Sequence, residues 1–201
     1  SDRELEYQFN DSGAKVLIAI DLLGNRMIDL RPRTKIKQII ITSIGDYLPF
    51  PKNLLFPLVA KKKRLAASVK PSPDVFFWKD CIARHEPYSR NVKIGFNDVA
   101  MYQYTGGTTG VSKGVELTHA NLACQVQQAA AWFPKLERGK EIMLGALPYF
   151  HGFGLTACMN FAISMVCPQV LIPKPQHEPL LKAIKTYPTT LAPLVTTMYV
   201  G

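Results

Sequence analysis

The chain has 201 residues, of which 47% are apolar and 19% charged, and its net charge at pH 7 is +9. This apolar fraction excludes a disordered chain, and the 13 Gly and 15 Pro follow no period, which excludes a collagen-like repeat. The sequence has no run of about 20 apolar residues of the kind that predicts a transmembrane helix. The four cysteines have no metal-binding spacing, so we expect reduced thiols in a cytoplasmic protein.

Helices alternate with short apolar runs along the chain. Ser1 and Glu4 have the spacing of a capping box, which predicts a helix that ends within residues 10–13. Short apolar runs predict buried strands at residues 16–20, 36–42, 99–105, 142–147, 170–172 and 190–195. Helices are predicted at residues 75–85, 120–133, 153–166 and 179–187. This alternation predicts an α/β fold, with a largely parallel β-sheet flanked by helices.

The positive charge is concentrated in one segment. Residues 31–70 contain ten basic residues and a single acid, whereas the rest of the chain is neutral. Such a patch indicates an anionic partner. Residues 54–60 are apolar and run directly into Lys61, Lys62, Lys63 and Arg64. This pattern is typical of a segment that binds the surface of an anionic membrane, here its inner face. A solvated loop, a helix end or contact with another part of the protein is the alternative. Nucleic acid is not expected, because basic and aromatic residues do not interleave.

A glycine-rich segment follows the strand predicted at residues 99–105. Residues 104–114 read Tyr-Thr-Gly-Gly-Thr-Thr-Gly-Val-Ser-Lys-Gly, with four glycines within nine residues, and precede a helix after a short connection. Glycines let a backbone turn tightly and direct several N–H groups into one concavity, while hydroxyls and Lys113 add further donors. This composition suits a polyphosphate, and an ordinary turn is the alternative. The spacing matches neither the Walker motif nor G-x-G-x-x-G.

The order of residues in this segment resembles the phosphate-binding signature of the adenylate-forming superfamily, which includes acyl-CoA synthetases, luciferases and peptide-synthetase adenylation domains. The usual pattern is T-[SG]-G-T-T-G-x-[PSA]-K-G, and residues 105–114 satisfy every position. Residues 115–122, 147–156 and 188–199 resemble later segments of the same superfamily, in the same order. Within it, the bacterial long-chain fatty-acid–CoA ligases are the most similar group, on residues 3–6, 10–13, 41–46 and 104–107.

The resemblance implies that residues 1–201 are a fragment of the large N-terminal AMP-binding domain of a longer enzyme. The small C-terminal domain, and the motifs that hold adenine, ribose and a Mg²⁺-binding Glu, are then absent from this sequence. We therefore expect the isolated chain to bind ATP weakly and to be catalytically inactive.

The implied reaction has two steps. A fatty carboxylate attacks the α-phosphorus of ATP to give an acyl-adenylate and pyrophosphate, and the thiol of the co-substrate CoA then displaces AMP. No protein nucleophile is needed, so catalysis must come from alignment and from neutralising charge on the leaving pyrophosphate. The resemblance assigns catalytic roles to Lys113 and Thr109, and assigns phosphate binding to Thr105, Gly106, Gly107, Thr108, Thr109, Gly110, Ser112 and Lys113.

Two further roles rest on the resemblance. Thr105 is placed near Mg²⁺, and His151 in the acyl pocket, with a histidine hydrogen-bonded to backbone at a helix start as the alternative for His151. One face of the helix predicted at residues 153–166 either lines an acyl tunnel or is plain core; it contains Phe153, Ala157, Phe161 and Met165. The alternative functions are a ligase that adenylates an aryl or amino acid, and a stand-alone nucleotide-binding module.

Overall fold

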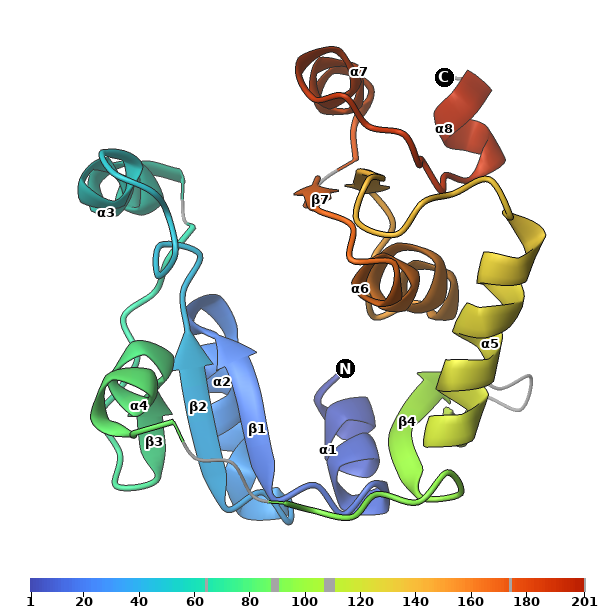
Figure 1. The fold of residues 1–201 in the computed structure, drawn as a ribbon. Coiled ribbons are helices and arrows are strands. Elements are labelled where there is room, and N and C mark those ends of the chain that lie inside the picture. Colours follow the sequence, from blue (N-terminus) through green and yellow to red (C-terminus); the bar gives the residue numbers. More distant parts are fainter. Residues whose placement is uncertain (64, 88–90, 107–110, 174, 201) are drawn as a thin grey trace. The chain divides into compact units, whose positions relative to one another are not determined.

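The structure, a computed structural model, describes residues 1–63, 65–87, 91–106, 111–173 and 175–200 (Figure 1). The chain divides into two compact units. The first comprises Ser1–Lys93 with Tyr104–Gly114, and the second comprises Ile94–Gln103 with Val115–Gly201. Both units combine helices with strands, so the predicted α/β class is confirmed.

The first unit is built on a three-stranded sheet whose strand order is β1-β2-β3. The strands are parallel, with Val16 opposite Gln38 and Ile39 opposite Val75. Figure 1 shows α2 packed along β1 and β2. In chain order the elements are α1 (Asp2–Asp11), β1 (Val16–Ile20), α2 (Asp21–Leu30), η1 (Arg31–Arg33), β2 (Gln38–Thr42), α3 (Lys52–Lys63), β3 (Val75–Phe77) and α4 (Trp78–Arg84).

Helix α1 begins and ends as the sequence predicts. The Ser1 hydroxyl accepts a hydrogen bond from the Glu4 backbone N–H, and the Glu4 side chain returns to the N-terminus, which completes the capping box. The chain leaves the helix through Gly13, whose φ of 65° is one that glycine adopts without strain. Leu5 and Phe9 pack from this helix against the core of the unit.

The core of the first unit lies on one face of its sheet. Ile39 and Ile41 of β2 are buried there with Met27 of α2. Gly24 lets the side chain of Val69 pack closely against α2, because a Cβ at that position would lie 2.7 Å from Cγ2 of Val69. The other face is open at β1, where Ile18 is 56% exposed. The expectation that residues 16–20 are buried is therefore wrong, because the helices of this unit cover a single side of β1.

The second unit contains a parallel pair of strands, β6 (Met143–Gly145) and β7 (Gln169–Leu171). Leu191 forms an isolated parallel bridge with Met143 beside this pair. The helical elements of the unit are α5 (His119–Trp132), the π-helix η2 (Gly154–Asn160), α6 (Phe161–Ser164), α7 (His177–Thr186) and α8 (Thr196–Val200). The Thr118 hydroxyl caps α5 by accepting a hydrogen bond from the Asn121 N–H.

Strand β6 is buried on both faces, as expected for a central strand of a parallel sheet. On one side Met143 packs with Val126 and Phe161. On the other side Leu144 packs with Leu180 and Ala183 of α7. The second unit therefore has two small cores, one on each face of the same strand.

A further pair of strands, β4 (Val99–Thr105) and β5 (Lys113–Thr118), forms a two-stranded sheet. The strand predicted at residues 99–105 is confirmed, whereas β5 was not predicted. The glycine-rich segment therefore joins two strands, and the next helix begins only after β5. The alternating residues of β5, Lys-Gly-Val-Glu-Leu-Thr, include a glycine, which weakens the strand pattern in the sequence.

Two other predicted elements differ from the structure. Val75–Phe77 is strand β3 rather than the first turn of a helix, because it pairs with β2 and consists of β-branched and aromatic residues. The predicted strand at residues 190–195 is reduced to the bridge at Leu191, and Pro193 limits its pairing because proline has no N–H to donate. No helix in the described part of the chain is long and apolar enough to cross a membrane.

Candidate functional site

The glycine-rich loop connects the end of β4 to the start of β5. Of the predicted phosphate-binding residues, Thr105 is the last residue of β4 and Lys113 the first of β5, and both are exposed. Gly106 is exposed as well, and Ser112 is partly buried. Gly107, Thr108, Thr109 and Gly110 lie outside the described residues.

Both ends of this loop are bonded to helix α1. Before the loop, the Tyr104 hydroxyl donates to Oδ2 of Asp11 at 2.6 Å. After the loop, the Gln8 side-chain amide donates to Oγ of Ser112 at 3.2 Å. Burial, together with the hydrogen bond to Asp11 and its negative charge, raises the pKa of Tyr104 to about 12. The phenol therefore remains a hydrogen-bond donor at neutral pH.

These contacts leave anion-binding groups available. Because the Ser112 oxygen accepts from Gln8, its own O–H proton is free to point to another acceptor. Within the described ranges, no carboxylate forms an ion pair with Lys113. A hydroxyl donor and an exposed ammonium on adjacent residues are suited to oxygens of a phosphate chain.

The described residues give no independent support for a metal site. They contain no group of three or more His, Cys, Asp or Glu that could hold a metal ion. The hydroxyl of Thr105 is a single weak ligand, so its placement near Mg²⁺ remains a prediction from the resemblance.

The second predicted motif, residues 147–156, forms the turn that follows β6 and the first residues of η2. The His151 N–H donates to the Pro148 carbonyl at 3.1 Å, and the Leu155 N–H donates to the His151 carbonyl at 2.8 Å. The imidazole Nδ1 of His151 accepts from the Phe153 N–H at 3.2 Å. His151 thus satisfies a backbone donor at the start of the helical segment, which is the contact that its alternative interpretation predicted.

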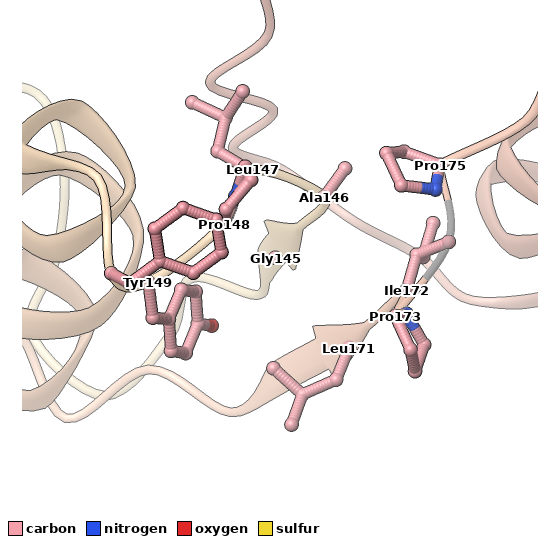
Figure 2. Close-up of a pocket in the computed structure, with 10 residues that line it drawn as sticks. Gly145, Ala146, Leu147, Pro148, Tyr149, Leu171, Ile172, Pro173 and Pro175 are labelled. Carbon is pink, nitrogen blue, oxygen red and sulfur yellow. The ribbon is translucent and has the colours of Figure 1, made fainter. Parts of the chain in front are cut away.

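A pocket of about 320 Å³ lies at the carboxyl ends of β6 and β7, and we call it the strand-end pocket. Figure 2 shows Pro148 and Tyr149 on one side, with Leu171 and Pro173 across from them. The Tyr149 hydroxyl donates to the Gln169 side chain, and burial raises the pKa of this tyrosine. The carboxyl ends of parallel strands are a frequent position for ligands.

Tyr149 can lie over β6 only because residue 145 is a glycine. A Cβ at Gly145 would lie 2.5 Å from the Tyr149 hydroxyl oxygen and 3.0 Å from Cδ2 of Leu171. The glycine therefore lets the ring form a wall of the strand-end pocket.

A second pocket, of about 430 Å³, is lined mainly by apolar side chains, and we call it the Phe153 pocket. Phe153, Ala157 and Phe161 line it from the helical segment that follows His151. The lining also includes Ala129 and Phe133 from α5 and its end, and residues 190–194. Three of the four residues predicted to share a face therefore meet at one pocket, whereas Met165 packs against the core. His151 is exposed and is not among the described residues that line either pocket.

Comparisons with known proteins agree on one superfamily. A sequence model of the AMP-binding enzyme family matches residues 1–201. A long-chain-fatty-acid–CoA ligase from Bacillus subtilis is 39% identical over 203 residues, covering 100% of this chain and 36% of the ligase. The same-named ligase from Salmonella typhimurium is 34% identical over 201 residues, covering 98% of this chain and 36% of that protein. The chain thus spans little more than a third of the length of these relatives.

A solved structure gives the same fold. The crystal structure of a putative long-chain-fatty-acid CoA ligase from Rhodopseudomonas palustris aligns with a TM-score of 0.73 at 18% identity. The alignment covers 98% of this chain and 42% of that one. It shows that the fold of this chain is found in part of that protein.

The tightest contact of the second motif predicts the effect of one substitution. A Cβ at Gly154 would lie 2.1 Å from the Pro148 carbonyl oxygen, a backbone atom that cannot rotate away. We expect Gly154→Ala to lower the free energy of unfolding by about 1–3 kcal/mol, measured by urea denaturation. Gly152→Ala is the matched control, because nothing lies within 4 Å of that Cβ, and it should change stability by less than about 0.5 kcal/mol. Equal losses at both glycines would contradict this account of the turn.

Proposed function

The chain belongs to the AMP-binding enzyme family, and on that premise we propose that it is part of an ATP-dependent long-chain fatty-acid–CoA ligase. The observation that carries the proposal is the loop between β4 and β5, where the Ser112 hydroxyl proton and the exposed Lys113 ammonium are both available to an anion. The names of the relatives, at 33–39% identity, support the same substrate class.

In the proposed reaction the loop acts on the pyrophosphate that leaves. The fatty carboxylate attacks the α-phosphorus of ATP, the bond to the β-phosphate oxygen breaks, and negative charge grows on that oxygen. Lys113, the Ser112 and Thr109 hydroxyls and the loop N–H groups stabilise this charge. CoA then attacks the acyl carbon through its thiol, and AMP leaves. Mg²⁺ neutralises phosphate charge when it is bound, and Thr105 is the residue of this chain that would contact it through its hydroxyl.

The rest of the machinery lies outside residues 1–201 under this proposal. The chain is then a fragment of the N-terminal AMP-binding domain, and the small C-terminal domain is supplied by the rest of the enzyme. The relatives are long enough to contain such further parts, since the chain covers 36% of them. Activity is therefore tested in the intact protein that contains this chain.

The Phe153 pocket is the proposed acyl site. Its apolar lining and its volume of about 430 Å³ suit a hydrocarbon chain, and it directly follows the His151 turn. A charged amino-acid substrate would lack a partner there, because the polar groups of the lining are those of Thr190 and Tyr199, and the Tyr199 hydroxyl already donates to the Ala192 carbonyl. An aryl carboxylate would also fit an apolar pocket, so activation of palmitate must be compared with activation of benzoate to separate a fatty-acid ligase from an aryl-acid ligase.

We also propose that helix α3 docks the enzyme on an anionic membrane. The helix is seated through Ala60, which is buried, and through Phe56, whose ring lies against Gly45. Leu54 and Leu58 point away from the unit, 65% and 74% exposed. The last turn of the helix consists of Lys61, Lys62 and Lys63.

The charge of this segment selects the partner. An exposed apolar face can be covered by protein or by lipid, but the excess of basic residues in 31–70 favours a surface that is itself negatively charged. Leucines can enter the acyl boundary while neighbouring cations pair with lipid headgroups, each contributing about 1 kcal/mol. Peripheral association would also place the enzyme where fatty acids partition.

The first prediction concerns the phosphate loop. In the intact protein, Lys113→Ala should lower the rate of acyl-adenylate formation about 10²- to 10³-fold, because a charge-stabilising donor is lost from the site. ATP–pyrophosphate exchange measures this step without CoA. Lys135→Ala is the control, since Lys135 is also exposed but follows α5 in the sequence and is not part of the loop. A loop variant that keeps the parental exchange rate would overturn the proposed function.

The second prediction concerns the acyl site. Ala157→Trp should fill the Phe153 pocket and raise the KM for palmitate about tenfold, while the KM for octanoate changes less. Ile163→Trp, at a position 64% exposed in the same helical segment, should change neither value. If the parent activates benzoate or amino acids but not palmitate, the fatty-acid assignment is wrong although the ligase chemistry stands.

The third prediction concerns the membrane. Reversal of three charges in K61E/K62E/K63E should weaken binding of the intact protein to phosphatidylglycerol vesicles about a hundredfold, from the loss of about 1 kcal/mol per cation. Leu54→Ser with Leu58→Ser should weaken it as well. The control, K79E/K93E/K135E, has the same net charge and should bind as the parent does. Vesicle co-sedimentation in which all variants match the parent would exclude α3 as the docking helix.

A further inference from the structure

Helix α1 contacts the residue just before the loop and a residue near its end, although the helix lies about a hundred residues earlier in the sequence. Gln8 bonds to Ser112 across 104 residues, and Asp11 bonds to Tyr104 across 93. These two partners stand immediately before and immediately after the stretch from Thr105 to Val111. Positions 8 and 11 are three apart, so they occupy one side of α1.

The two stems of the loop also contact each other. Tyr104 on β4 lies over Gly114 on β5, where a Cβ would come within 3.0 Å of Cζ of the ring. Gly114 therefore provides the space through which the Tyr104 ring reaches α1. The contacts form one connected set, from Asp11 through Tyr104 to Gly114, and from Gln8 to Ser112.

The chemistry of these bonds suits a loop that receives an anion. Gln8 uses an amide N–H to hold the Ser112 oxygen, so the hydroxyl keeps its own proton for a ligand. The Asp11 carboxylate, which would repel a phosphate, accepts from the Tyr104 hydroxyl. The helix thus holds the stem after the loop through one amide N–H donor, and the stem before it through a carboxylate that is itself hydrogen-bonded.

We propose that Gln8, Asp11 and Tyr104 are positioning residues for ATP, which fix the two stems of the phosphate loop on α1 and so direct the Ser112 hydroxyl and Lys113 toward the phosphates. The inference rests on the proposed function. It assigns to α1 a part in nucleotide binding in addition to its part in the core of the first unit, where Leu5 and Phe9 pack.

The test compares bonds of α1 that reach the loop with bonds of the same helix that do not, in the intact protein. Tyr104→Phe and Gln8→Leu should each raise the KM for ATP about two- to tenfold, the range expected for loss of one hydrogen bond, with a matching loss of affinity for a fluorescent ATP analogue. Asn10→Ala is the matched control. Asn10 donates to the Arg33 carbonyl and accepts from the Lys35 N–H, so it loses bonds of α1 that do not reach the loop.

A conservative variant separates positioning from charge. Asp11→Asn keeps an acceptor for the Tyr104 hydroxyl and should retain ATP affinity close to that of the parent, whereas Asp11→Leu should weaken it as Tyr104→Phe does. Gln8→Leu and Ser112→Ala break the same hydrogen bond. The double variant should therefore lose less ATP affinity than the product of the two single losses.

The outcomes distinguish this inference from the function on which it rests. If Asn10→Ala and Gln8→Leu lower the urea midpoint equally and neither changes the KM for ATP, the contacts are structural only and the inference is wrong. That result leaves the ligase assignment intact as long as Lys113→Ala remains impaired. If the parent neither binds the ATP analogue nor exchanges pyrophosphate, the proposed function itself fails.

Discussion

Under the proposed function, the loop between β4 and β5 must keep most of its N–H groups, hydroxyls and its cation available for a phosphate chain, so few of them can hold the loop in place. Its position has to be fixed from outside, by residues next to the loop and by a neighbouring element. In this chain the neighbouring element is α1, which bonds to Tyr104 before the loop and to Ser112 after it. Because α1 is anchored in the core through Leu5 and Phe9, the loop stems are linked to the most buried part of the first unit.

In the second unit, a pocket lies beside a small parallel sheet, and a few residues determine its shape. Met143 and Leu144 are buried on opposite faces of β6, and the strand then ends at Gly145. Beyond this point the chain turns back over Pro148, and the absence of a Cβ at Gly154 allows the helical segment to start against the Pro148 carbonyl. The turn thereby presents Phe153 and Ala157 on the side of the segment that lines the Phe153 pocket.

Local signals in the sequence predicted much of this arrangement. The capping box at Ser1 is determined by residues three apart, and α1 begins where this pair places it. Strand β3 was missed because Val75–Phe77 is too short to show a period, and its pairing with β2 is a tertiary contact. Helix α3 was missed because Pro57 lies within it and its apolar residues do not fall on a single face. Burial of β1 was overestimated, since an apolar run does not reveal how many layers cover it.

Some residues of the candidate site can be recognised from one segment of the sequence, whereas others are brought to it only by the fold. The glycines, hydroxyls and Lys113 indicated a candidate phosphate-binding loop, because all of these residues lie within one segment. Gln8 and Asp11 gave no such signal, because a glutamine and an aspartate near the end of an amphipathic helix are ordinary surface residues until the fold brings Ser112 and Tyr104 to them. For His151 the resemblance implied the acyl pocket, and the contact in the structure, in which its imidazole accepts from the Phe153 N–H, is that of the alternative interpretation. Motifs of this kind therefore locate the groups that can face a ligand, whereas the residues that hold those groups in place emerge only from the tertiary contacts.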